Sequence, residues 1–387
     1  MKKTKKLNIK YNSTSLLIFC ITMFLVLFGI LMVYSASFYY AEKTYNNSYF
    51  YLIKQAVGFF VGLIALIFLS KFNYLKLKKI SLLSLIIGYI LLLLVFVPGI
   101  GVTNYGATRW IRMPGFTIQS SEIAKFCFVL FSANVLSKSY KNVKTFKGVL
   151  PVIVAGGIMC LLIILEPNMS ITMCVGIVMV VMLVVGGMSL KHFIIIAVPA
   201  LMLACVLIII EPYRFDRLLA FINPWANPKG EGYQLIQSFF SISDGGLFGV
   251  GLFNSRQKYL FLPFAESDFI FSVVAEEFGL IGCVAILILY FILIVCGIKV
   301  AIKAKDRFGC YLATGITAVI AVQTLLNVSV VSGLIPPTGL PLPFISAGST
   351  SIVVFMAAIG VLLNISKNEK LSNTTNVFEI KKNKMSV

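Results

Sequence analysis

Basic and acidic side chains come in succession along the segment 254–277, NSRQKYLFLPFAESDFIFSVVAEE. Arg256 and Lys258 come first, and their cations can meet an anionic substrate. Glu266 and Asp268 follow at the entrance of an apolar helix. A carboxylate such as Asp268, at the mouth of a membrane cavity, can take a proton from a hydroxyl group, which is general-base chemistry. An ordinary helix N-cap is the alternative role for Asp268, and the two roles do not exclude each other.

The same helix carries a second acidic pair, Glu276 and Glu277, inside a run that is long enough to span a membrane. Charges in a membrane span are costly, so each of them needs a partner or a function. Neighbouring residues on a helix differ by about 100° in direction, so the two carboxylates are not expected to face one cavity together. We expect them in supporting roles, with one of them paired to a buried lysine.

Glycines are concentrated just before and inside the basic part of this segment, in GGLFGVGLFNSRQK (245–258). A nucleotide-binding fingerprint needs a preceding strand, and the pattern predicts no strand there. Turns and tight packing explain these glycines better.

A further charged pair lies in the segment QSSEIAK (119–125), where Glu122 and Lys125 are three residues apart. At that spacing the two side chains share one face of a helix and can form an ion pair. One interpretation is a buried pair that fixes helix packing. The other is the wall of a substrate site, in which Lys125 binds an anion and Glu122 positions it.

Arg109, in the segment GATRWIRMPG (106–115), stands beside Trp110. Tryptophan is frequent at membrane–water interfaces, so this arginine is either an interfacial anchor or a ligand for a phosphate group. His192 is the single histidine, and the eight cysteines have no CxxC spacing and fit small core residues. The sequence therefore predicts no metal-ligand set.

The composition shows which elements must carry these residues. Hydrophobic residues make up 59% of the 387-residue chain and charged residues only 12%, well below the roughly 25% that is usual in soluble domains. Apolar runs long enough to cross about 30 Å of hydrocarbon recur along the chain. We predict an all-α, polytopic integral membrane protein with about ten transmembrane helices, at residues 15–36, 50–70, 80–99, 119–138, 148–165, 169–188, 192–210, 268–299, 308–331 and 347–365.

The positive charges predict the orientation. Basic clusters such as KFNYLKLKK (71–79) and KVAIKAKDR (299–307) fall on the side of the basic N-terminus, and the positive-inside rule puts that side in the cytoplasm. With an even number of spans, both termini are cytoplasmic. The net charge of +19 then follows from this rule and from attraction to anionic lipid headgroups, so nucleic-acid binding is not expected.

One loop is much longer than the others. Residues 211–267 are expected to form a large extracellular loop between the seventh and eighth helices, and its aromatic residues, glycines and prolines predict partial order with short interfacial helices. Two other outer loops, 100–118 and 333–346, are expected to meet it. The predicted parts of the chain are a cytoplasmic N-terminal tail (1–14), one membrane domain (15–365) and a cytoplasmic C-terminal tail (366–387).

Taken together, these segments resemble the SEDS family (shape, elongation, division and sporulation), which includes FtsW, RodA and SpoVE. The resemblance runs from the first predicted span to the last, and the segment 245–258 is most similar to the FtsW and SpoVE branch. The motifs that carry it are, in chain order, GILMVYSAS (29–37), GATRWI (106–111), QSSEIAK (119–125), FINPW (221–225), GYQLIQS (232–238), GGLFGVGLFNSRQK (245–258), DFIFSVVAEE (268–277) and GLPLPFIS (339–346).

The resemblance implies a peptidoglycan glycosyltransferase of the bacterial cytoplasmic membrane. Such enzymes polymerise lipid II, a disaccharide pentapeptide on undecaprenyl pyrophosphate, into β-1,4-linked glycan strands on the outer face. The product serves division or the spore cortex and septum. These enzymes work with a class B penicillin-binding protein and with other division or sporulation membrane proteins.

The resemblance also implies roles for single residues. Asp268 corresponds to the family's essential aspartate and is the expected general base, while Glu122 and Lys125 correspond to the family's ExxK pair. Glu266 is expected near the substrate and Ser346 in a supporting role. No cofactor is predicted, although two carboxylates beside a pyrophosphate can recruit Mg²⁺. The pyrophosphate leaving group needs cations, for which the candidates are Arg109, Lys125, Arg256 and Lys258.

The chain departs from the family pattern in several places. Ser120 stands where the family has proline, Asn168 where it has an acid, and Phe264 where it has glutamate. Two other functions stay open: a lipid II flippase with a path through intramembrane charges, and a scaffold that only recruits and activates a penicillin-binding protein. The acidic residues collect on the predicted outer side, where polymerisation takes place, and this favours the enzyme.

Overall fold

The structure is a computed structural model of the 387-residue chain, and it describes residues 13–104, 107–114, 116–140, 143, 145–189, 191–195, 197–199, 202 and 212–367. In this part of the chain eight helices are long and apolar enough to cross a membrane. The all-α membrane architecture expected from the sequence is confirmed. The eight helices are α1 (Ser13–Tyr45), α2 (Phe50–Lys71), α3 (Leu77–Leu94) with the preceding 3-10 turn η1 (Tyr74–Lys76), α5 (Phe146–Leu165), α6 (Met169–Gly186), α10 (Ile270–Lys303), α11 (Arg307–Val331) and α12 (Ser349–Lys367).

The helix α4 (Ser120–Lys138) matches the fourth predicted span but is not among these eight. It carries Glu122, Lys125 and Lys138, and these charges lower its mean hydropathy. It nevertheless lies inside the bundle, since it packs against α3 and α11. The seventh predicted span, 192–210, lies largely outside the described residues.

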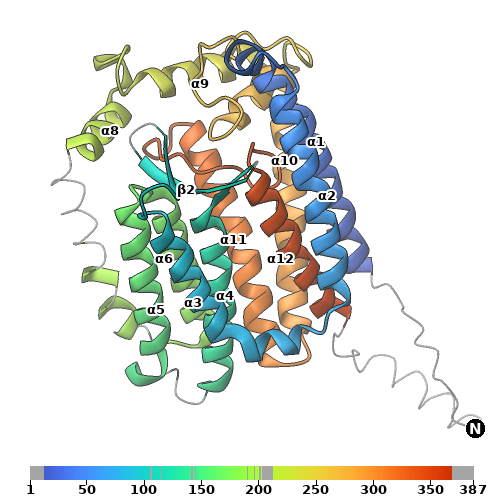
Figure 1. Ribbon diagram of the computed structural model, residues 1–387, viewed down its shortest axis with the longest axis vertical. Coiled ribbons are helices and arrows are strands. Elements are labelled where there is room, and N and C mark those ends of the chain that lie inside the picture. Colours follow the sequence, from blue (N-terminus) through green and yellow to red (C-terminus); the bar gives the residue numbers. More distant parts are fainter. Residues whose placement is uncertain are drawn as a thin grey trace, which may run out of the picture.

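The long helices stand side by side in one bundle (Figure 1). Within it α2 packs along α12, α3 along α4, and α10 along both α11 and α1. Small residues let two membrane helices approach closely. A Cβ on Gly58 of α2 would lie 3.0 Å from the Cα of Ser349, and one on Gly62 would lie 2.7 Å from the Sδ of Met356, both on α12. The GxxxG spacing on α2 therefore sets the distance between these two helices.

The outward faces of the helices are apolar. Phe60 and Ile64 of α2 and Leu82 of α3 are mostly exposed. Lipid chains cover such surface in a bilayer, whereas in water it would promote association. Polar side chains such as Ser35 and Gln55 are buried inside the bundle. This distribution is that of a membrane protein with polar contacts in its interior.

A small antiparallel sheet, which the sequence did not predict, lies at one end of the bundle (Figure 1). Its strands pair in the order β1-β2-β3. Trp110 of β2 lies opposite Gln119 of β3, and β3 leads directly into α4. The sheet thereby holds Arg109, in the middle strand, above the helices. The strands are β1 (Gly101–Asn104), β2 (Ala107–Met113) and β3 (Phe116–Gln119).

Short helices were expected in the loop 211–267, and the described part of this loop contains them. They are α8 (Pro212–Ile222), the 3-10 turn η2 (Pro224–Ala226) and α9 (Tyr233–Gly245). They lie at the same end of the bundle as the sheet (Figure 1). The predicted tails, 1–14 and 366–387, lie almost entirely outside the described residues, and their cytoplasmic location stays a prediction.

Candidate functional site

A cavity of about 1060 Å³ lies at the end of the bundle that carries the sheet. The sheet, α8, the loop before α10 and the loop between α11 and α12 all contribute to its wall. Of the residues predicted for the site, Arg109, Lys258, Glu266 and Asp268 are brought together here. The charged residues of its lining are Arg109, Arg217, Lys258, Glu266 and Asp268.

Asp268 is held in the cavity wall through its backbone. Asn327 of α11 donates from Nδ2 to the carbonyl of Asp268 at 2.9 Å and to the carbonyl of Leu340 at 2.6 Å. Gly339 lies against the carboxylate, because a Cβ there would be 2.9 Å from the Oδ2 of Asp268. The φ of +49° at Gly339 also favours glycine. The loop between α11 and α12 therefore fits closely against this carboxylate.

The loop before α10 is tied to the loop between α11 and α12. The Oγ of Ser346 donates to the carbonyl of Ser267 at 2.6 Å and accepts from the amide of Leu342 at 2.7 Å. The amide of Ala347 donates to the carbonyl of Glu266 at 2.8 Å. This geometry gives Ser346 the supporting role that was expected for the PLPFIS motif.

The surroundings of Asp268 make its carboxylate a suitable base. Burial raises the pKa of Asp268 to about 6, while the guanidinium groups of Arg109 and Arg217 act to lower it. A carboxyl group with this pKa is mostly ionised at neutral pH and is more basic than an ordinary aspartate. It can therefore accept a proton from a hydroxyl group that binds in the cavity.

Glu266 is the second carboxylate of the cavity wall. Burial raises its pKa to about 7; a backbone hydrogen bond acts to lower this pKa, and the charge of Asp268 raises it. Glu266 is therefore partly protonated near neutral pH, whereas Asp268 is mostly ionised. Partial protonation reduces the repulsion between the two groups.

Arg109 is anchored at the C-terminal end of α5. Its Nε donates to the carbonyl of Glu166 at 3.4 Å, and it also donates to the carbonyl of Pro167. The buried side chain of Glu166 accepts a hydrogen bond of 3.2 Å from Ser120. Burial raises the pKa of Glu166 to about 8, against the lowering effects of Ser120 and Arg109. Glu166 is then largely protonated at neutral pH, and little carboxylate charge opposes the guanidinium of Arg109.

Arg217 of α8 reaches the cavity from the long loop, and the sequence did not single it out. It donates to the carbonyl of Pro337 at 3.1 Å and forms an ion pair of 3.6 Å with Glu231. Pro337 belongs to the loop between α11 and α12, so Arg217 connects two of the segments that line the cavity. Its charge acts on Asp268 together with that of Arg109.

Glu122 and Lys125 form a buried ion pair of 2.8 Å and do not line the cavity. Lys125 also donates to the Oε1 of Gln323 on α11 at 2.5 Å. Glu122 accepts from Ser351 of α12 at 3.1 Å, and Ser351 itself belongs to the cavity wall. Both charged groups are thus paired with each other and hydrogen-bonded to residues of α11 and α12. The geometry favours the interpretation as a helix-packing pair, and the expectation that Lys125 binds an anion in the cavity needs this correction.

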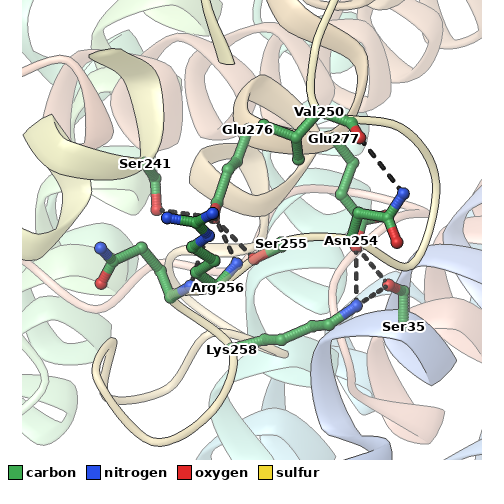
Figure 2. Close-up of polar contacts among 10 residues, drawn as sticks. Ser35, Ser241, Val250, Asn254, Ser255, Arg256, Lys258, Glu276 and Glu277 are labelled. Carbon is green, nitrogen blue, oxygen red and sulfur yellow. Dashed lines mark hydrogen bonds and ion pairs between the residues drawn. The ribbon is translucent and has the colours of Figure 1, made fainter. Parts of the chain in front are cut away.

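Arg256 does not line the cavity, although it was a candidate cation. Its side chain is exposed, and its backbone amide donates to the Oε1 of Glu276 at 2.6 Å. Lys258 contributes to the cavity wall, but its ammonium group lies 3.0 Å from the Oε1 of Glu277. The expected pairing of one of the two glutamates with a buried lysine is therefore confirmed. Figure 2 shows this group of residues.

Carboxylates that could meet a metal ion are sparse in the described part of the chain. No group of three or more His, Cys, Asp or Glu side chains there is placed to hold one. Among the described residues, Glu266 and Asp268 are the two carboxylates in the cavity wall. Recruitment of Mg²⁺ by these two groups with a pyrophosphate stays a prediction.

Comparison with known proteins decides the family. The family model for FtsW, RodA and SpoVE, described as "Cell cycle protein", matches residues 15–371. The chain belongs to the FtsW/RodA/SpoVE family. Stage V sporulation protein E of Bacillus subtilis is 39% identical over 360 residues, which cover 92% of this chain and 98% of that protein. The probable peptidoglycan glycosyltransferase FtsW of Geobacter metallireducens is 38% identical over 367 residues, with coverage of 94% and 98%.

Two solved structures share the fold of this chain. A chain from a peptidoglycan synthase complex that coordinates polymerization and crosslinking has a TM-score of 0.74 at 25% identity, over 92% of this chain and 98% of that one. RodA of Thermus thermophilus has a TM-score of 0.65 at 22% identity, over 92% and 97%. The resemblance inferred from the motifs is confirmed, and the chain is a multi-pass protein of the bacterial cytoplasmic membrane.

The departures from the FtsW/RodA/SpoVE pattern have structural roles in this chain. Ser120 donates to the side chain of Glu166, as described above. Asn168 caps α6, since its Oδ1 accepts a hydrogen bond of 3.4 Å from the amide of Ile171. Phe264 adopts a positive φ of 57° and lines the cavity. Glu266 and Asp268 lie in the cavity wall together with Phe264.

Proposed function

We propose that this chain is a peptidoglycan glycosyltransferase, which polymerises lipid II into β-1,4-linked glycan strands at the outer face of the cytoplasmic membrane. The observation that carries this proposal is Asp268, a carboxylate with a raised pKa, in one cavity wall with Arg109 and Arg217. The relatives named as probable peptidoglycan glycosyltransferases support the reaction class. The relative named as a sporulation protein supports a role in division or sporulation.

The charge distribution supports an outward-facing cavity. Positive charge in a membrane protein collects on the cytoplasmic side. The cavity lies at the end with the sheet, α8 and α9, opposite to most basic helix ends (Figure 1). These basic residues at helix ends are Lys71 of α2, Lys138 of α4, Lys303 of α10, Arg307 of α11 and Lys367 of α12.

The proposed reaction joins a hydroxyl group to an anomeric carbon. The 4-hydroxyl of the acceptor sugar attacks C1 of the donor, and the C1–O bond to undecaprenyl pyrophosphate breaks. Asp268 takes the hydroxyl proton as the new bond forms. The electrons of the broken bond leave with the pyrophosphate, whose negative charge is stabilised by Arg109 and Arg217. Attack from the opposite face converts the α-linked donor into a β-linked product.

Each group of the cavity wall has a place in this scheme. Arg109 and Arg217 approach from two different elements, so they can contact different oxygens of one pyrophosphate. Glu266 is partly protonated and can relay the proton that Asp268 has taken. The cavity lies at the end of a bundle whose outward faces are apolar, which suits a lipid-linked substrate that enters from the membrane.

We also propose a class B penicillin-binding protein as the partner. The structural relative from a peptidoglycan synthase complex is described as coordinating polymerization with crosslinking. A polymerase whose product must be crosslinked benefits from a crosslinking enzyme beside it. The scaffold function then becomes one part of the same activity.

The experiment that separates an enzyme from a transporter uses purified protein with its cognate penicillin-binding protein in liposomes. Labelled lipid II is supplied on the outer side, and both polymer and the side on which the label resides are measured. We expect glycan polymer to form with no requirement for transport. Movement of the label across the bilayer without any polymer would support the flippase alternative and contradict the proposal.

A further inference from the structure

The helix α10 is interrupted inside its length. Gly279 has a φ of +64° and a ψ of −166°, which separates the turns at 270–278 from the long remainder of the helix. A break in a membrane helix leaves backbone N–H and C=O groups that lipid cannot bind. The glycine-rich segment 245–251 supplies their hydrogen-bond partners.

The segment 245–251 fits closely against the break. A Cβ on Gly249 would lie 2.2 Å from the carbonyl oxygen of Glu277, so a larger residue does not fit there. This gives the glycines of the motif a specific packing role. Backbone hydrogen bonds join the segment to both sides of the break: Leu280 N to Gly246 O at 2.9 Å, Ile281 N to Leu247 O at 3.2 Å, Val250 N to Glu276 O at 2.9 Å and Gly251 N to Glu277 O at 3.1 Å.

The break makes the segment 270–278 a short helical unit of its own. Asp268 lies two residues before this unit, so the unit helps to fix its position together with the contact from Asn327. A helix of about two turns has few internal hydrogen bonds and needs contacts from outside to keep its place. Glu276 and Glu277, at the far end of the unit, provide such contacts.

Glu276 binds the loop that follows the glycine-rich segment (Figure 2). Its carboxylate accepts hydrogen bonds of 2.6 Å from the Oγ of Ser255 and from the amide of Arg256. Longer bonds of 3.4 Å come from the amide of Gln257 and the Oγ of Ser241. The unit 270–278 is thereby joined to both the loop and α9.

Glu277 binds Lys258 and α1 (Figure 2). The Nζ of Lys258 lies 3.0 Å from the Oε1 of Glu277 and 3.2 Å from the Oγ of Ser35. The Oγ of Ser35 donates to the same carboxylate oxygen at 2.6 Å. Both side chains of the ion pair are fully buried. One lysine thus joins three parts of the protein: α1, the loop and the unit that carries Asp268.

The ammonium group of Lys258 is occupied by these contacts. A contact between Lys258 and the pyrophosphate would require this buried ammonium group to leave Glu277, and a buried carboxylate without its partner is strongly unfavourable. Lys258 does belong to the cavity wall, and the loop continues from it through Leu260 and Leu262 toward Glu266. A substitution of Lys258 can therefore alter the cavity in two ways: directly in the cavity wall, and through the ion pair with Glu277.

We infer that Lys258 is a positioning residue: through its ion pair with Glu277 it holds the unit 270–278 against α1 and so places the Asp268 carboxylate in the cavity. This inference rests on the proposed function, since Lys258 acts on the base of that reaction. Lys258 would thus differ in role from Arg109 and Arg217, which are proposed to bind the pyrophosphate of the substrate. Its loss should slow the chemical step rather than weaken substrate binding.

The test compares kcat and KM for glycan polymerisation among variants of the full chain in complex with its penicillin-binding protein. Lys258→Met is expected to lower kcat at least about tenfold with KM within about threefold, because a base displaced by about 1 Å loses much of its effect. Lys258→Arg keeps the ion pair and is expected to recover most of the rate. The double variant Lys258→Met/Glu277→Gln removes the unpaired charge and is expected to recover part of it.

Ser35→Ala removes two hydrogen bonds of the network, one to Glu277 and one from Lys258, but leaves the ion pair in place. It replaces Lys258→Met in the test if that variant does not fold. It is expected to lower kcat severalfold with KM unchanged. Lys229→Met, at an exposed lysine of the same long loop, is the matched control and is expected to match the wild type. A kcat within twofold of wild type in both Lys258→Met and Ser35→Ala would overturn the inference. So would a raised KM with unchanged kcat, since Lys258 would then bind substrate directly.

Asp268→Asn is measured in parallel, so that failure of the positioning role of Lys258 can be told apart from failure of the proposed glycosyltransferase function. An inactive Asp268→Asn protein beside a fully active Lys258→Met protein defeats the positioning role alone. An active Asp268→Asn protein defeats the proposed function, and with it the reason for a positioning residue.

Discussion

The side-chain amide of Asn327 donates to the backbone carbonyl of Asp268 at 2.9 Å, so α11 is joined to the start of α10 at the residue that faces the cavity. The same amide donates to the carbonyl of Leu340 at 2.6 Å. One buried side chain thereby holds both of the loops that surround the carboxylate.

Replacing Asn327 by alanine should therefore affect stability and activity together. Two carbonyls lose their donor in Asn327→Ala, and we expect unfolding to become easier by about 1–3 kcal/mol. The polymerisation rate of the remaining folded protein should fall, because the Asp268 loop is no longer held. Thermal unfolding in detergent and a rate normalised to folded protein measure the two effects. Asn364→Ala is the control, since Asn364 makes comparable bonds to Ser70 and Tyr74 away from the cavity; loss of normalised rate in both variants would contradict the prediction.

A substitution at Gly339 tests the position of the Asp268 carboxylate more directly, because alanine adds only one carbon atom there. Gly339→Ala introduces a Cβ 2.9 Å from the Oδ2 of Asp268 at a φ of +49°. We expect at least a tenfold loss of rate, since displacement of a catalytic group by about 1 Å can cost about 100-fold. Gly157→Ala is the matched control, because a Cβ on Gly157 meets no atom within 4 Å. Equal rates for the two variants would show that Asp268 tolerates displacement.

The pH dependence of the polymerisation rate should follow the ionisation of the Asp268 carboxyl group. Burial raises its pKa to about 6, and a base must be ionised to accept a proton. The rate should therefore rise with pH and reach half of its plateau near pH 6. Since the pKa of this acid is higher in the folded protein than in the unfolded chain, its stabilising contribution is present at low pH and is lost as the pH rises through about 6. A rate that stays flat from pH 5 to 8 would be inconsistent with Asp268 as the base.

The pair Glu122 and Lys125 allows a test of the helix-packing interpretation. Lys125→Met leaves the buried Glu122 carboxylate without its cation, which should cost about 3–5 kcal/mol of stability. The double variant Glu122→Gln/Lys125→Met should regain much of this loss. Thermal unfolding measures stability, and the rate per folded molecule should change far less than stability does. A double variant that is stable but inactive would instead support a direct role of Lys125 with the substrate.

Much of the fold could be predicted because hydropathy over a span is a strong and local signal. The predicted runs 50–70, 148–165 and 308–331 lie within or close to observed helices. The pairing of one of the two glutamates with a lysine also followed from local reasoning, since a charge inside an apolar helix requires a partner; the structure shows that the paired residue is Glu277. The small sheet was missed because its outer strands have only four residues each, too few for a clear alternation.

The cavity was predicted only in part, because its wall depends on contacts between distant segments. Arg217 lies on a short helix within a long polar loop, and no periodicity indicates which of its charges reaches the bundle. Glu166 at the end of an apolar run looks like an ordinary helix end. Lys125 and Arg256 had suitable charges and lie outside the cavity wall. The interruption at Gly279 was hidden because its immediate neighbours, Phe278 and Leu280, are apolar and continue the hydrophobic run.

The most direct measurement is the rate of glycan polymer formation by purified Asp268→Asn protein with its cognate penicillin-binding protein and labelled lipid II. The amide is similar in size to the carboxylate but accepts no proton, so the rate should fall about 10²–10⁴-fold. Asp244→Asn, at an exposed acid of α9, is the matched control and should polymerise at the wild-type rate. Polymer formation by Asp268→Asn at the rate of wild type would contradict the account.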